Sequence, residues 1–238
     1  MKLLAPIISI ALATMAIGAE PGGQVRTEFV TLSLGKNEGP FYYRNDGEIA
    51  TLSASSKGIG AAIAYNGSRL LSLYGSPDGL TERQVGETVP KPVAQVRLPF
   101  GEDRVLLMFS NPGGIDKDAV TLNATGISSD KMKAGDYRLF NMSKQQVLVV
   151  MNEQKAVIEP RSIADVSDAS WKSDVIDMQV QLGVKDEGGP RRVYSSVWGH
   201  RPGRRTFLFI FDRSDEFRPV EIRCYYDVPR LKEPGPQD

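Results

Sequence analysis

Residues 176–184 read IDMQVQLGV, and this stretch decides the fold class. Apolar side chains occupy every second position from Ile176 to Val184, with polar residues or glycine between them. Successive side chains of an extended strand point to opposite faces, so this period of two predicts a strand with one buried and one wet face. Residues 220–226 repeat the alternation. There the predicted buried side carries Val220, Ile222, Cys224 and Tyr226.

Three continuous apolar runs predict strands that are buried on both faces: Val105–Phe109, Val147–Met151 and Phe207–Phe211. They are rich in β-branched and aromatic residues, and turn residues bound them at short intervals. Helical spacing is nowhere sustained over three turns. We therefore expect an all-β chain of short strands with little helix, arranged as β-sandwich-like units of immunoglobulin-like or Greek-key type.

The chain of 238 residues is long enough for two units or for one larger domain. Residues 126–135, GISSDKMKAG, are small and polar, which predicts a linker between a first unit at 20–128 and a second at 129–230. Sheets that continue across this segment would instead make a single domain. Residues 231–238 are expected to form a flexible tail.

Residues 1–19 have the features of a secretory signal peptide. Lys2 precedes an apolar run that is short for a membrane span, and small residues follow at 16–19. The chain is thus expected to be exported, to a periplasm or to the cell surface and beyond, with no transmembrane segment after cleavage. The alternative is an uncleaved membrane anchor. The sequons at Asn66, Asn123 and Asn141 matter only in a host that glycosylates exported proteins.

Composition excludes several classes of function. Lys and Arg number 29 and Asp and Glu number 29, so no bulk attraction to nucleic acid is expected. A single cysteine excludes an intramolecular disulfide and a Cys-based zinc site. With one histidine besides, the expectation is no metal site and no cofactor.

The run SASSKGIGAAIA at 53–64 resembles the phosphate-binding loop of short-chain dehydrogenases. That family's first glycine is replaced by Ala54, and no tyrosine of the chain has a lysine four residues later. Asn66-Gly67 follows directly between two apolar segments, a pattern typical of a type I′ hairpin turn. We therefore interpret the similarity as coincidental and predict a β-hairpin at Asn66-Gly67.

Positive charge is concentrated at 191–205, RRVYSSVWGHRPGRR, which contains the only histidine. Arginine forks bind carboxylates and phosphates, and a tryptophan offers a stacking surface. The alternative is a solvated loop whose charge is balanced by acids elsewhere. The residues predicted to bind an anionic ligand are Arg191, Arg192, Trp198, His200, Arg201, Arg204 and Arg205.

His200 is expected to lie exposed in a Gly/Pro-containing loop. A catalytic triad would need it, with Ser195 or Ser196 as the nucleophile, but the chain has no Gly-x-Ser-x-Gly elbow. Cys224 is interpreted as a small buried hydrophobe. No catalytic residue is predicted.

Residues 135–143 read GDYRLFNMS, a Gly-x-Tyr-Arg-x-x-Asn-x-Ser run. It resembles a pattern in exported, uncharacterised bacterial β proteins, in which the run opens a small sandwich. The resemblance covers about a quarter of the chain, and it implies an envelope-associated β-sandwich and no chemistry. Physically, the run predicts a strand over 137–140 that ends at an Asn/Ser turn bonded to the backbone.

These observations together predict an exported, non-enzymatic binding or structural protein of the cell envelope, whose partner is an envelope protein or an anionic glycan. The alternative is a secreted hydrolase acting on polysaccharide or peptide. A third possibility is an assembly that pairs through an exposed strand edge.

Overall fold

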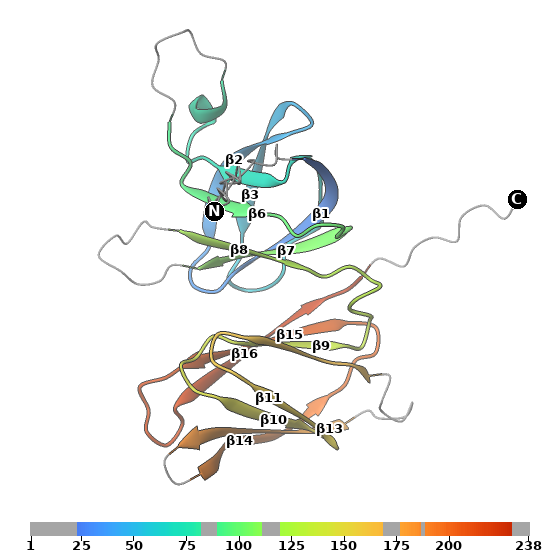
Figure 1. The fold of residues 1–238 in the computed structure, drawn as a ribbon, viewed down its shortest axis with the longest axis vertical. Helices are drawn as coiled ribbons and strands as arrows, with labels where there is room; N and C mark the ends of the chain where they lie inside the picture. Colours follow the sequence, from blue (N-terminus) through green and yellow to red (C-terminus); the bar gives the residue numbers. More distant parts are fainter. Residues whose placement is uncertain (1–22, 82–89, 111–119, 169–176, 187–188, 230–238) are drawn as a thin grey trace, which may run out of the picture.

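The fold is all-β, as predicted. The computed structural model describes residues 23–81, 90–110, 120–168, 177–186 and 189–229, which form strands and one short 3-10 helix (Figure 1). No helix in these ranges is long and apolar enough to cross a membrane. The predicted signal peptide and the predicted tail lie outside the described residues.

The first half of the chain forms the N-terminal unit, in which one four-stranded sheet of order β4-β1-β7-β8 is joined by the pairs β2-β3 and β5-β6. Their aromatic and aliphatic side chains share one buried core that includes Phe29, Tyr43 and Phe109. The elements are β1 (Gln24–Ser33), β2 (Glu38–Asn45), β3 (Glu48–Ala54), β4 (Ile63–Ser68), β5 (Leu70–Leu73), the 3-10 helix η1 (Pro77–Leu80), β6 (Ala94–Arg97), β7 (Arg104–Ser110) and β8 (Thr121–Gly126).

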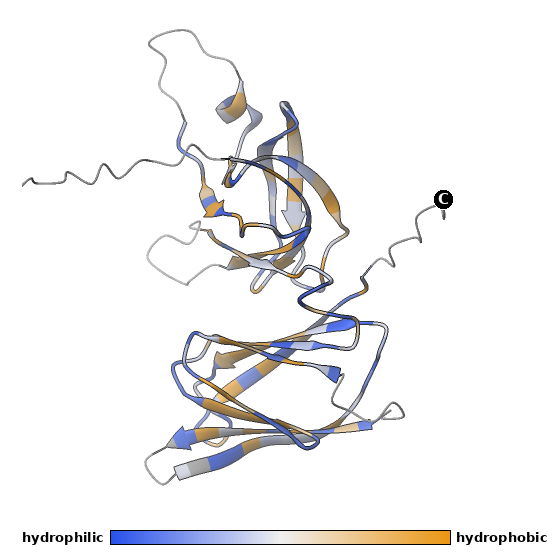
Figure 2. Cartoon of the chain, turned by 45° about the vertical axis from the view of Figure 1, so that its right-hand side comes forward, coloured by the Kyte–Doolittle hydropathy of each residue, from blue (hydrophilic) through white to orange (hydrophobic). Residues whose placement is uncertain are grey.

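The second half forms the C-terminal unit, a sandwich of two four-stranded sheets of order β11-β10-β13-β14 and β12-β9-β15-β16. A second core fills the space between these sheets. Figure 2 shows apolar and polar residues alternating along its strands. The strands are β9 (Tyr137–Asn141), β10 (Val147–Met151), β11 (Gln154–Ile158), β12 (Ile163–Val166), β13 (Asp177–Asp186), β14 (Gly189–Gly199), β15 (Arg205–Asp212) and β16 (Val220–Asp227).

The predicted burial patterns are confirmed in most of the strands for which they were stated. In β13, the alternate residues Met178, Val180, Leu182 and Val184 are each at most 1% exposed, whereas Ile176 lies outside the described residues. Residues 105–109 and 207–210 are buried on both faces, as predicted. In β10, by contrast, Leu148 and Val150 are only half-buried, because the outer face of that sheet meets solvent.

A third cluster explains the doubly buried strands, because it lies between the two units. Alternate residues of β1 and β7, including Leu32 and Leu106, pack there against Phe140, Phe207 and Phe209 from β9 and β15. The sheets of β1-β7 and β9-β15 therefore each bury one face in their own unit and the other face against the neighbouring unit. Figure 1 shows the two units stacked along the long axis of the molecule.

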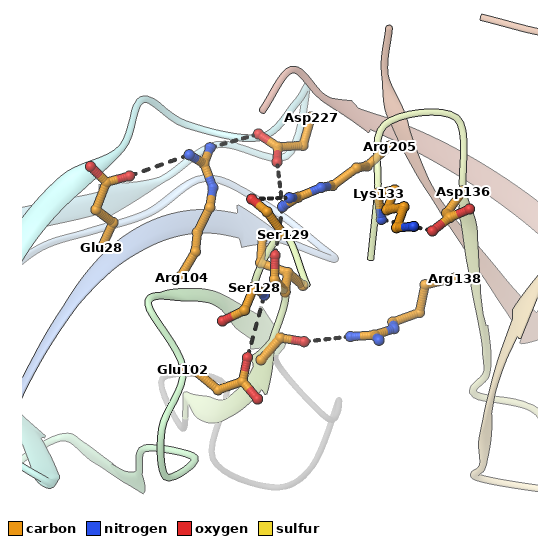
Figure 3. Close-up of polar contacts among 12 residues, drawn as sticks. Glu28, Glu102, Arg104, Ser128, Ser129, Lys133, Asp136, Arg138, Arg205 and Asp227 are labelled. Atoms are coloured by element: carbon orange, nitrogen blue, oxygen red, sulfur yellow. Dashed lines mark hydrogen bonds and ion pairs between the residues drawn. The ribbon is translucent and has the colours of Figure 1, made fainter. Parts of the chain in front are cut away.

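The junction also buries charge (Figure 3). Arg104 reaches from β7 to Asp227 of β16 at 2.8 Å and to Glu28 of β1 at 3.3 Å. Arg205, whose side chain is 1% exposed, lies 3.6 Å from the same Asp227 and donates to the Ile127 carbonyl. Buried ions of this kind require partners, so the contacts fix the two units in one arrangement.

Two predictions about local structure are wrong. Asn66-Gly67 is not a hairpin turn: it lies within β4, which pairs with β1, while β5 pairs with β6. In β16, Tyr225 was assigned to the wet face but is buried in the junction, whereas Tyr226 is 51% exposed. The segment predicted as a linker, residues 126–135, connects β8 to β9 and is packed into the junction, where Ile127 is 0% exposed.

Residues 53–64 lack the strand–turn–helix context of a dinucleotide loop. They leave β3, cross an irregular segment and enter β4, and Gly60 approaches Thr31 of β1 so closely that a Cβ there would lie 2.8 Å from the Thr31 hydroxyl. The glycine therefore permits a close crossing of two backbone segments.

Candidate ligand-binding site

A cavity of about 620 Å³ opens at one side of the C-terminal sandwich, between the edge strands β14 and β16. At the opposite side, β11 and β12 pack against each other and close the sandwich, and no comparable packing joins β14 to β16 in the described part of the chain. The lining residues are Tyr137, Val193, Tyr194, Ser195, Trp198, Gly199, Thr206, Arg213, Arg218, Val220, Glu221, Ile222, Cys224 and Tyr226.

A β-bulge shapes the β14 wall of this cavity. The register with β13 shifts between Leu182 and Gly183, so that Val193 of β14 stands opposite no residue of β13. A bulge of this kind turns the strand and re-aims its side chains. Val193 and Tyr194 consequently both line the cavity although they are adjacent in sequence.

Aromatic rings form much of the wall. The Trp198 indole Nε1 donates to the Tyr194 hydroxyl at 2.9 Å, and the two rings meet edge to face with centroids 6.2 Å apart. Tyr226 faces them from β16, and the Arg204 guanidinium lies 5.8 Å from its ring centroid. The rings present flat apolar surfaces with polar edges, which suit ligands that have both characters.

Arginines stand at both ends of the cavity. At one end, Arg213 and Arg218 come from the connection between β15 and β16, and Arg191 donates to the Glu216 carbonyl of that connection at 3.2 Å. At the other end are Arg204 and Arg201, whose guanidinium approaches Gly199.

Among the described residues, Glu221 is the one acid that lines the cavity, and an arginine is paired with it. Glu221 accepts from Arg223 at 2.7 Å, and this hydrogen bond lowers the pKa of the Glu221 carboxyl. Arg213 and Arg218 are the cations that line the cavity, and the connection that carries them also holds the acids Asp215 and Glu216.

The floor is made of groups that keep their protons. Burial raises the pKa of the Tyr137 hydroxyl to about 12 and that of the Cys224 thiol to about 12. A thiol with such a pKa is a poor nucleophile at neutral pH, which agrees with the interpretation of Cys224 as a small hydrophobe.

His200 lies beneath this floor, so the expectation of an exposed loop histidine is wrong. The ring is 7% exposed; its Nδ1 is 3.1 Å from the Tyr137 hydroxyl and its Nε2 is 3.7 Å from Asp168. Burial lowers the pKa of His200 although Asp168 opposes the change, and burial followed by repulsion from Asp136 raises the pKa of Asp168.

Neither serine proposed for a triad stands next to this histidine. Ser195 lines the cavity, and Ser196, four residues before His200 on an extended strand, is about 13 Å away along the chain. In the described ranges, no group of three or more His, Cys, Asp or Glu side chains is placed to hold a metal ion.

The seven residues of the predicted anionic site are thus distributed over four places. Trp198 lines the cavity, and Arg191, Arg201 and Arg204 stand at its ends. His200 supports the floor, and Arg192 is exposed on the outer face of β14, opposite Gly183. Arg205 is completely buried in the junction between the units, so it is not available to a ligand.

Sequence analysis missed Tyr137, Tyr194, Arg213, Arg218 and Tyr226. Arg213 and Arg218 lie in the polar connection that follows β15. They could have been recognised as site residues only if β14 and β16 had been known to be edge strands. Tyr226 was assigned to a buried face by alternation, and Tyr137 was assigned to a strand by the Gly-x-Tyr-Arg run.

The Gly135–Ser143 run has a structural role for each of its fixed positions. Gly135 has a φ of +93° and lies directly against the Asp168 carboxylate, where a Cβ would clash. Arg138 forms a two-pronged pair with Asp165 at 2.7 and 2.8 Å. Asn141 donates to the carbonyls of residues 145, 158 and 159 and accepts from Ser143, which confirms the predicted strand and Asn/Ser turn. Because Asn141 is 0% exposed, its sequon is inaccessible in the folded chain.

No protein-family model matches the chain, and no curated protein sequence matches it.

Proposed function

We propose that this protein is an exported, non-enzymatic binding protein, and that its C-terminal unit binds an anionic ligand in the cavity between β14 and β16. The signal-peptide pattern at residues 1–19 supports export. The observation that carries the binding proposal is the cavity itself, which has aromatic walls, arginines at both ends and, among its described lining residues, one acid that is paired with Arg223.

The chemistry of the cavity floor supports the non-enzymatic part of the proposal. Cys224 and Tyr137 have pKa values raised to about 12, so neither is deprotonated near neutral pH. His200 contacts Asp168 and Tyr137, and of these two partners Tyr137 is the one that lines the cavity. These groups position one another and shape the cavity.

The test uses two anionic polymers as probes, oligogalacturonate and oligoglutamate, with binding followed by titration calorimetry. The variants Trp198→Ala and Arg218→Ala remove one wall and one end of the cavity, and we expect each to weaken binding by about tenfold or more, because an aromatic stack or a charge-assisted contact is worth about 1–3 kcal/mol. Arg192→Ala is the matched control, since Arg192 is on the same strand but faces away from the cavity.

Equal affinity of all four proteins for a probe, or no binding of either probe, would contradict the proposal. Release of shortened products from either polymer would indicate the secreted hydrolase instead.

A further inference from the structure

Among the described strands, none pairs with the edge of β14 beside the cavity. β14 is the last strand of its sheet and pairs with β13 alone. From Tyr194 to Gly199 its backbone pairs with β13, and the one further contact that the described structure gives is a 3.5 Å hydrogen bond from the Ser196 hydroxyl to the Val197 carbonyl. Alternate N–H and C=O groups of this stretch therefore point along the sheet toward the space in front of β16.

The strand on the other side of the cavity, β16, is also an edge strand. β16 is the last strand of the facing sheet, and its ladder partner among the described strands is β15. Two unpaired edges thus border one cavity with aromatic walls. An extended chain that enters this space can satisfy backbone groups along one edge while every second side chain enters the cavity.

Charge selects the occupant. The regular edge from Tyr194 to Gly199 is about 20 Å long, and arginines stand beyond both of its ends. A short strand with apolar alternate residues and carboxylates at both termini fits this pattern. A strand with lysines at its termini would form no such ion pairs with these arginines.

We infer that the anionic ligand is an extended acidic polypeptide segment of another protein, which adds as a strand to the edge of β14 and inserts alternate side chains between Trp198 and Tyr226. This inference rests on the proposed function and specifies its ligand. An unpaired strand edge distinguishes a polypeptide from an acidic glycan, because a glycan has no regular series of amide groups with which to continue a sheet.

The probe is the capped peptide Glu-Glu-Val-Thr-Val-Ser-Val-Glu-Glu, whose length as a strand is about 30 Å. Binding is followed by the fluorescence of Trp198 in the Trp171→Phe protein, which removes the only other tryptophan of the sequence. Two further peptides carry N-methyl groups on alternate residues, one in each of the two phases. Only one phase directs its N–H groups at β14, so we expect methylation in that phase to weaken binding about tenfold or more and methylation in the other phase to have little effect.

A peptide with lysine in place of every glutamate measures the contribution of charge, and oligogalacturonate provides the glycan comparison. The expected order is acidic peptide tightest, with the lysine peptide and the oligosaccharide at least about tenfold weaker. Equal loss in both methylated phases, no loss in either, or tighter binding of the oligosaccharide would overturn the strand inference while anionic binding remains. Failure of both acidic probes would overturn the proposed function as well.

Discussion

Arg205 gives the sharpest stability prediction, because it is a buried cation at the junction of the two units. Its guanidinium donates to the Ile127 carbonyl and to the Ser129 hydroxyl at 3.0 Å, and it lies 3.6 Å from Asp227. Burial lowers its pKa, with Asp227 opposing the change. Arg205→Ala removes all three contacts and leaves a space between the sheets.

The expected cost is worked from these contacts. Hydrogen bonds from a charged donor contribute about 1.5–3 kcal/mol each, and breaking a buried ion pair costs about 3–5 kcal/mol because the remaining charge loses its partner. Asp227 keeps Arg104 at 2.8 Å, so we expect the lower part of that range, about 3 kcal/mol, in the free energy of unfolding by urea. Arg205→Met fills the same space but has no hydrogen-bond donors, so it should recover only the part of the lost free energy of unfolding that comes from packing.

Arg213→Ala is the control, since Arg213 is half-exposed and pairs with Asp215 only at 3.9 Å. It should change stability by less than about 0.5 kcal/mol. If Arg205→Ala costs no more than Arg213→Ala, the junction is not held by its buried charges and the reasoning is refuted.

Three further predictions concern single side chains. His200 is the only histidine of the sequence, so NMR gives a single imidazole titration, in which we expect a pKa below 6.5. The unfolded chain then binds the proton more readily than the folded chain, so the free energy of unfolding falls as the pH drops below 6.5. A pKa above 6.5 would show that attraction to Asp168 outweighs burial. The Cys224 thiol, with its pKa raised to about 12, should react with iodoacetamide at pH 8 about 1,000-fold more slowly in the native protein than in urea, and similar rates would mean that it is open to solvent. Asn141→Ala should cost about 1–3 kcal/mol by urea unfolding, because its buried amide no longer donates to the carbonyls of residues 145, 158 and 159, whereas the exposed Asn123→Ala should cost little; equal costs would show that the Asn141 amide does not stabilise this turn.

The strands were predictable where a single core determines the pattern. β13 buries alternate residues in one core, so its period of two was a sufficient signal. β7 and β15 read as uninterrupted apolar runs, and they are buried on both faces because each belongs to two cores. The sequence alone could not show that the second layer is the other unit.

The failures have the same physical origin. In β16, Tyr225 was assigned to solvent, but a neighbouring unit covers that face. Asn66-Gly67 favours a tight turn locally, yet pairing of β4 with β1 keeps it extended, so a tertiary contact overrides the local preference.

The candidate site was only partly predictable. Of the seven residues predicted within 191–205, Trp198 lines the cavity, and the eleven-residue strand β14 separates the arginines that precede it from those that follow it. Arg205 and His200 could not be assigned from the sequence, because their burial depends on Asp227 and Asp168, which are distant in the chain.

Hydrogen exchange of backbone amides, measured by mass spectrometry with and without the acidic nonapeptide, tests the binding site most directly. The free edge of β14 should exchange readily in the unbound protein, and saturation with peptide should protect residues 194–199 together with the facing residues of β16. Protection confined to the N-terminal unit or to the outer face of the β13 sheet, or none at saturation, would contradict the assignment of the cavity as the binding site.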